Sequence, residues 1–181
     1  MTDEQNWAEL TPEETLKATG ILYSDLKDLI VFGVFPNGTV GTLFTSNSSS
    51  MNLMWILKAM DWDAVSENED PLPLTTDVYE SLKDQLDDDK SLHPVCRQAL
   101  KQMTNMNHII VAGLTEAHEL TMATSKDVNF MMTSFCVDWF RFQLLNQMTT
   151  AAQQQAQQAQ QAAQQQGAQQ KAPQKQAQAK K

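Results

Sequence analysis

The sequence predicts an α+β fold, in which two hairpin–helix units supply an antiparallel sheet of about four strands with helices packed on one face. An apolar, β-branched run at residues 29–35 leads through Asn37-Gly38 into a second run. This is a strong hairpin signal, because both turn residues accept a positive φ. The same order of run, turn, run and helix recurs over residues 108–145. We therefore expect two related halves, a divergent repeat over residues 11–65 and 76–148, sharing one sheet.

The first half begins with a helix and a hairpin. Residues 1–9 are a polar lead-in. In residues 11–14, Thr, Pro and two Glu form a helix start, since Thr caps free N–H groups and Pro tolerates the first turn. A helix is predicted over residues 12–27. The strands of the first hairpin are predicted at residues 29–35 and 39–45.

The middle of the chain is predicted to be helical, with acidic breaks. The polar residues 46–50 supply helix caps, and the apolar spacing over residues 51–62 predicts a helix over the sheet. Residues 66–73 are acidic and proline-punctuated, which is typical of a linker. Two shorter helices are predicted at residues 76–86 and 91–106.

The second hairpin is expected at residues 109–114 and 119–124, with a turn near residues 116–118 that lacks Gly and Asn. Aligning the two hairpins pairs Thr45-Ser46 with Thr124-Ser125 if one position is deleted at the second turn. The type of this turn does not follow from its residues.

The last predicted helix, at residues 127–148, is the most apolar in the chain. Apolar residues run nearly all round it, which indicates burial on two sides. One side belongs to the sheet, and the other is expected to contact a partner subunit or the first helix pair. The candidate partner-contact residues are Phe130, Met131, Phe135, Trp139 and Phe142.

Residues 149–181 form a Gln/Ala-rich, low-complexity tail that has nothing to bury, so residues 10–148 are the expected folding unit. The last helix can continue through residues 149–166, because Gln and Ala are good helix formers. Beyond Gly167 we expect disorder. A solubilising spacer and a tether to an acidic partner are both open roles for this tail.

The charge balance argues against several classes of partner. The net charge is −9, and the tail contributes four lysines and no acid, so the body carries −13. Nucleic-acid phosphates require Lys and Arg, and Arg97 and Arg141 are the only arginines. We expect no direct nucleic-acid binding by the body and no membrane attachment. With no signal peptide or membrane span, we expect the cytoplasm, and we interpret Cys96 and Cys136 as reduced core thiols.

No constellation of residues indicates catalysis, a metal or a cofactor. The three histidines, His93, His108 and His118, lack metal-site spacing. The acidic run Asp87–Asp89 lacks the ligand rhythm of a calcium loop and is interpreted as solvated. We interpret the tryptophans, Trp55 among them, as core residues, because stacking on nucleic-acid bases would need a basic groove beside the rings. We therefore expect no catalytic, metal-binding or cofactor-binding residue.

One segment carries a resemblance. Residues 28–60 contain the apolar strand, a Pro-Asn-Gly turn and a short helix rich in Leu, Met and Trp, and this segment resembles small tailed-phage proteins of unknown function. The resemblance implies a phage origin and an accessory or virion-associated role. It carries over no catalytic residue.

We interpret the chain as a non-catalytic protein-interaction or assembly protein that forms a homo-oligomer, located in the host cytoplasm or the virion. Two alternatives remain open at this point. The acidic body could act as a nucleic-acid mimic that inhibits a host nucleic-acid-binding enzyme. The chain could also be a small enzyme of unrecognised class.

Overall fold

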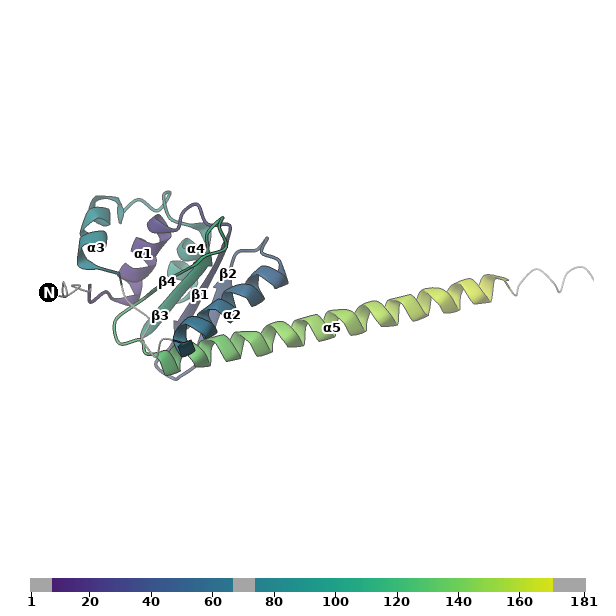
Figure 1. The fold of residues 1–181 in the computed structure, drawn as a ribbon. Coiled ribbons are helices and arrows are strands. Elements are labelled where there is room, and N and C mark those ends of the chain that lie inside the picture. The colour runs from purple at the N-terminus through teal and green to yellow at the C-terminus, as the bar shows by residue number, and fades with distance from the viewer. Residues whose placement is uncertain (1–7, 67–73, 171–181) are drawn as a thin grey trace, which may run out of the picture. The chain divides into compact units, whose positions relative to one another are not determined.

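The computed structural model describes residues 8–66 and 74–170 and divides the chain into two compact units, Met1–Arg141 and Phe142–Lys181 (Figure 1). Most of the expected lead-in, the linker and the end of the tail lie outside the described residues. The first unit holds the sheet, and the rest of this subsection concerns that unit unless stated otherwise.

The first unit contains one four-stranded antiparallel sheet in the order β2-β1-β3-β4. Its strands are β1 (Asp28–Val34), β2 (Val40–Phe44), β3 (His108–Leu114) and β4 (Leu120–Thr124). The first strand of each hairpin, β1 or β3, lies in the centre of the sheet, and the two strands pair with Val31 opposite Val111. The α+β class and the sheet of two hairpins are confirmed.

Helix α1 (Pro12–Leu22) begins as the sequence predicts. The Thr11 hydroxyl accepts a hydrogen bond from the Glu14 N–H, and the Glu14 carboxylate accepts one from the Thr11 N–H. The helix ends at Leu22, because the residues up to Lys27 form the turn that leads into β1. The prediction of a helix to residue 27 is therefore too long.

The region between α2 (Ser50–Ser66) and the second hairpin is less helical than expected. The predicted helix at residues 76–86 is α3 (Thr76–Leu82) followed by the 3-10 turn η1 (Lys83–Gln85). Helix α4 (Pro94–Gln102) starts at its proline, with the His93 ring accepting a hydrogen bond from the Val95 N–H.

The turns of the two hairpins are built alike. In the first, Gly38 has a φ of 77° and donates to the Phe35 carbonyl; in the second, His118 has a φ of 61° and donates to the Thr115 carbonyl. His118 therefore adopts the left-handed conformation that glycine adopts at the equivalent position, and both turns have the same length.

Because the turns are equal in length, the two halves correspond with a constant offset of 80 residues. Thr45 corresponds to Ser125, and each hydroxyl accepts a hydrogen bond from the first apolar residue of the neighbouring strand, Leu29 or Ile109. The one-residue deletion expected from the sequence is wrong. The two halves are thus arranged with a pseudo-two-fold relation.

The helices cover both faces of the sheet, where we expected one. Residues 29–33 of β1 are all buried, so side chains on both of its faces are covered. Leu29 packs in a core cluster with residues of α1 and α4, whereas the Phe32 ring lies 5.8 Å from the ring of Phe140 in α5. Figure 1 shows α1 and α4 on one side, and α2 (Ser50–Ser66) with the start of α5 (Phe130–Gln170) on the other. The continuous apolar run of β1 is typical of strands buried on both faces.

The second unit, taken by itself, is helical. Helix α5 continues through the Gln- and Ala-rich residues to Gln170, three residues past Gly167, where we expected the helix to have ended. Within the described residues, no helix is long and apolar enough to cross a membrane.

Candidate functional site

The candidate contact residues divide into exposed and partly buried side chains. Met131, Phe135 and Trp139 lie on the outward side of α5, while Cys136 and Phe140 on the same helix are buried. Phe130 is half-buried at the start of the helix. Phe142 is exposed and belongs to the second unit.

Helix α2 carries an apolar surface of the same kind, which the sequence analysis missed. Met51 and Trp55 are exposed, so the interpretation of Trp55 as a core residue is wrong. They occupy the positions equivalent to Met131 and Phe135 at the offset of 80. The i,i+4 spacing on a helix was the signal that could have identified them.

We call Met51 and Trp55 the α2 stripe, and Met131, Phe135 and Trp139 the α5 stripe. All five side chains are between 41% and 80% exposed. The order of buried and exposed positions in residues 51–60 is the same as in residues 131–140, except that Ala59 is half-buried where Trp139 is exposed. The two halves therefore present apolar side chains to solvent at equivalent places.

A salt bridge joins the two helices between these stripes. Arg141 lies 3.3 Å from the Asp61 carboxylate and also contacts Asp138, which is one turn earlier, at 3.0 Å. Arg141 and Asp61 are themselves equivalent positions. Because residues that face their own equivalents lie at a two-fold axis, the pseudo-two-fold axis passes between α2 and α5 at this pair.

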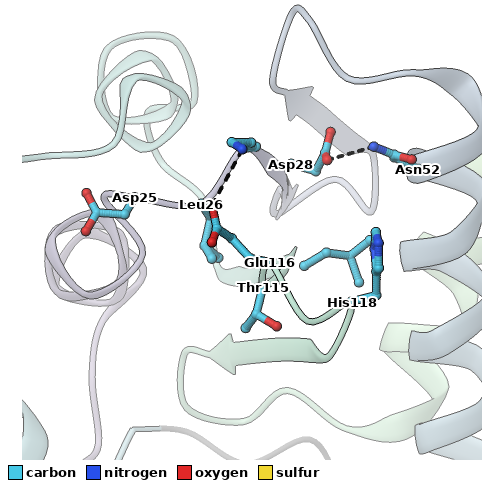
Figure 2. Close-up of a pocket in the computed structure, with 9 residues that line it drawn as sticks. Asp25, Leu26, Asp28, Asn52, Thr115, Glu116 and His118 are labelled. Atoms are coloured by element: carbon cyan, nitrogen blue, oxygen red, sulfur yellow. Dashed lines mark hydrogen bonds and ion pairs between the residues drawn. The ribbon is translucent and has the colours of Figure 1, made fainter.

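A second feature is a hollow of about 440 Å³ at the end of the sheet (Figure 2). Within it, the Asn52 amide donates to Asp28 over 2.8 Å, and Lys27 lies 3.5 Å from Glu116. Positions equivalent to these acids carry His108 and Pro36, so the two acidic side chains have no acidic counterpart in the other half. Its lining residues are Asp25, Leu26, Lys27, Asp28, Asn52, Leu114, Thr115, Glu116 and His118.

Four polar side chains of this hollow form two pairs, Asn52 with Asp28 and Lys27 with Glu116. Among the described residues, no three His, Cys, Asp or Glu side chains are grouped so that they could hold a metal ion. The hollow is open to solvent, and Lys27 and Glu116 are each more than four-fifths exposed. An exposed ion pair of this kind contributes little free energy.

The two cysteines and His93 are structural. Cys96 and Cys136 are buried and unpaired, and burial raises the pKa of each thiol to about 12, so both remain protonated at neutral pH. The His93 Nε2 lies 3.0 Å from the Leu26 carbonyl oxygen, and its Nδ1 accepts the Val95 N–H. The neutral ring satisfies both contacts, and burial lowers the His93 pKa.

Comparison with known proteins returns no relative. No protein-family model, no curated protein and no solved structure matches this chain.

Proposed function

We propose that this chain is a non-catalytic protein-interaction protein and that it binds its partner through the α2 and α5 stripes. The observation that carries the proposal is the exposure of large apolar side chains at equivalent positions on both helices. Exposed apolar surface of this kind is typical of interaction sites, because covering it removes an unfavourable contact with water.

Composition supports the same conclusion. Aromatic and methionine side chains are enriched at the centres of protein interfaces, and all five residues of the two stripes are of these types. The aromatic rings supply large contact area at low entropic cost, while methionine adapts to the shape of a partner.

The resemblance of residues 28–60 to small tailed-phage proteins supports an accessory or virion-associated setting for this interaction. In that setting, the chain would act in assembly. The proposal itself depends on the exposed stripes and not on the setting.

Affinity capture with matched variants tests the proposed surface. The bait is the full chain, compared with the double variant Trp55→Ser and Phe135→Ser, and bound chains are identified by mass spectrometry. The control is Leu22→Ser, which removes an exposed apolar side chain from α1 on the other side of the sheet. We expect the control to retain the proteins bound by the parent chain and the double variant to lose them, with all three chains folded. Equal retention by the double variant would refute the proposal.

Salt dependence separates this proposal from the acidic-mimic alternative. Apolar contacts persist in high salt, whereas a surface that presents carboxylates to a basic enzyme loses affinity as ionic strength screens the charges. We expect the captured partner to remain bound at about 0.5 M salt, where the Debye length is only a few ångströms.

A further inference from the structure

We propose that the partner of the two stripes is a second copy of this chain, with α2 of each copy packed against the first part of α5 of the other. This inference rests on the proposed function, because it names the partner for the same surface. Three observations carry it: a difference in side-chain size between the two helices, a difference in charge between them, and the neutral net charge of the surface that they form.

The first is a difference in size. At equivalent positions, α2 has Ala59 and α5 has the exposed Trp139. Beside Trp55, α2 also borders an open, apolar hollow of about 450 Å³, lined in part by Met51, Met54 and Leu114. At the position where α5 presents a protruding ring, α2 therefore presents a small side chain, and the hollow lies one to two turns before it on α2.

The second is a difference in charge. Lys58 on α2 corresponds to Asp138 on α5, and both side chains are exposed. When α2 of one copy faces α5 of the other, opposite charges meet. In a two-fold dimer this contact occurs twice, since each residue pair is repeated by the symmetry.

The third is the charge balance of the surface. Residues 51–61 and 131–141 contain only Lys58, Asp61, Asp138 and Arg141 as charged residues, so this surface is neutral in a chain of net charge −9. Two acidic molecules repel each other least when they meet through their neutral surfaces. The other 20 of the 22 acidic residues of the chain lie elsewhere in the sequence.

Lys58 and Asp138 lie near the centre of the proposed dimer. Lys58 and Asp138 each lie three residues before the Asp61–Arg141 pair, which is about 4.5 Å along a helix with a rise of 1.5 Å per residue. In a dimer centred on the pseudo-two-fold axis, Lys58 and Ala59 of one copy and Asp138 and Trp139 of the other therefore all lie within about 4.5 Å of the centre along their helices.

The available area is sufficient for a dimer. About half of each aromatic side chain is exposed, and the two methionines are exposed to a larger fraction. Together the five stripe residues present on the order of 500 Å² of apolar surface. A standard interface buries about 800 Å² per partner, of which a little over half is apolar. The stripes thus match the apolar share of one partner.

Sedimentation equilibrium of the full chain and three variants tests this arrangement. The variants are Lys58→Asp, Asp138→Lys and the double exchange, with Lys101→Asp on α4 as a control for charge reversal at an exposed residue on the other side of the sheet. We expect the parent chain to dimerise, and each single reversal at position 58 or 138 to weaken dimerisation about tenfold, because each creates two repulsive pairs. We expect the double exchange to recover most of the parent affinity and the control to dimerise like the parent.

Two results would overturn the inference: a parent chain that remains monomeric at about 100 μM, or a dimer that responds equally to reversals at positions 58, 138 and 101. Either result leaves the proposed function standing if the Trp55→Ser and Phe135→Ser variant still loses a different captured protein. If that variant loses no captured protein and the parent is monomeric, both proposals fail.

Discussion

Gly33 on β1 and Gly113 on β3 are equivalent positions whose surroundings differ, so replacing each with alanine separates two kinds of steric contact. A Cβ added to Gly113 would lie 2.9 Å from the main-chain oxygen of Asp28 and 2.7 Å from a methyl carbon of Leu26. A Cβ added to Gly33 would meet the side-chain sulfurs of Met106 and Met103 at 2.6 and 3.1 Å. The first obstacle includes backbone that the sheet holds in place, whereas the second consists of flexible side chains.

The expected costs follow from this difference. Overpacking a core against groups that cannot move costs about 1–3 kcal/mol, and replacing glycine with alanine recovers about 0.4–1 kcal/mol from the unfolded chain. We expect Gly113→Ala to destabilise the fold by about 1–2 kcal/mol. We expect Gly33→Ala to stay within about 1 kcal/mol of the parent chain, because the methionines can rotate away.

Urea unfolding followed by tryptophan fluorescence measures both variants, with an unchanged dependence on urea as evidence of two-state behaviour. In thermal unfolding, Gly113→Ala should lower Tm by roughly 4–8 °C, since about 1 kcal/mol corresponds to roughly 4 °C for a domain of this size. Equal losses in the two variants, or a larger loss in Gly33→Ala, would show that the Asp28 backbone is not the fixed obstacle described above.

Three further predictions concern the core. Phe140→Ala should cost about 3–5 kcal/mol in urea unfolding, because the ring packs against the rings of Phe32 and Phe44, at 5.8 and 5.4 Å, and its removal leaves a cavity; a cost below about 1 kcal/mol would contradict this packing. The pKa of His93 is lowered in the folded chain, so the unfolded chain takes up the proton first as the pH falls. The free energy of unfolding should therefore decrease as the pH drops below about 6.5. The difference between its values at pH 7.5 and 5.5 should be smaller in His93→Gln than in the parent chain. The thiols with pKa values of about 12 should not react with a disulfide reagent at pH 8 until urea unfolds the chain, and rapid reaction of either thiol in the native state would contradict their burial.

The two hairpins were predictable from the sequence because their signals are local. The Asn37-Gly38 turn and its flanking β-branched runs specify the first hairpin, and the structure places its strands within one residue of the expected bounds. The second turn was harder to interpret, because His118 adopts a left-handed backbone that its residue type does not announce. This one residue also obscured the constant offset between the halves.

The candidate site was predicted in part. Met131, Phe135 and Trp139 were identified because helix α5 has more apolar residues than one buried face can use. Trp55 was assigned to the core, because the apolar spacing of α2 gives no indication of which residues face the sheet. That choice depends on where the sheet lies.

The sequence by itself determined the local structure of this protein: the capped first helix, the two hairpins and the Gln/Ala-rich extension that has nothing to bury. Backbone preferences and short-range periodicity act over a few residues and can be read directly. Only the tertiary structure decided that β1 and β3 pair in the centre, that helices cover both faces, and which side of α2 and α5 remains in solvent. These features depend on contacts between residues about 80 positions apart, and no local pattern specifies such contacts.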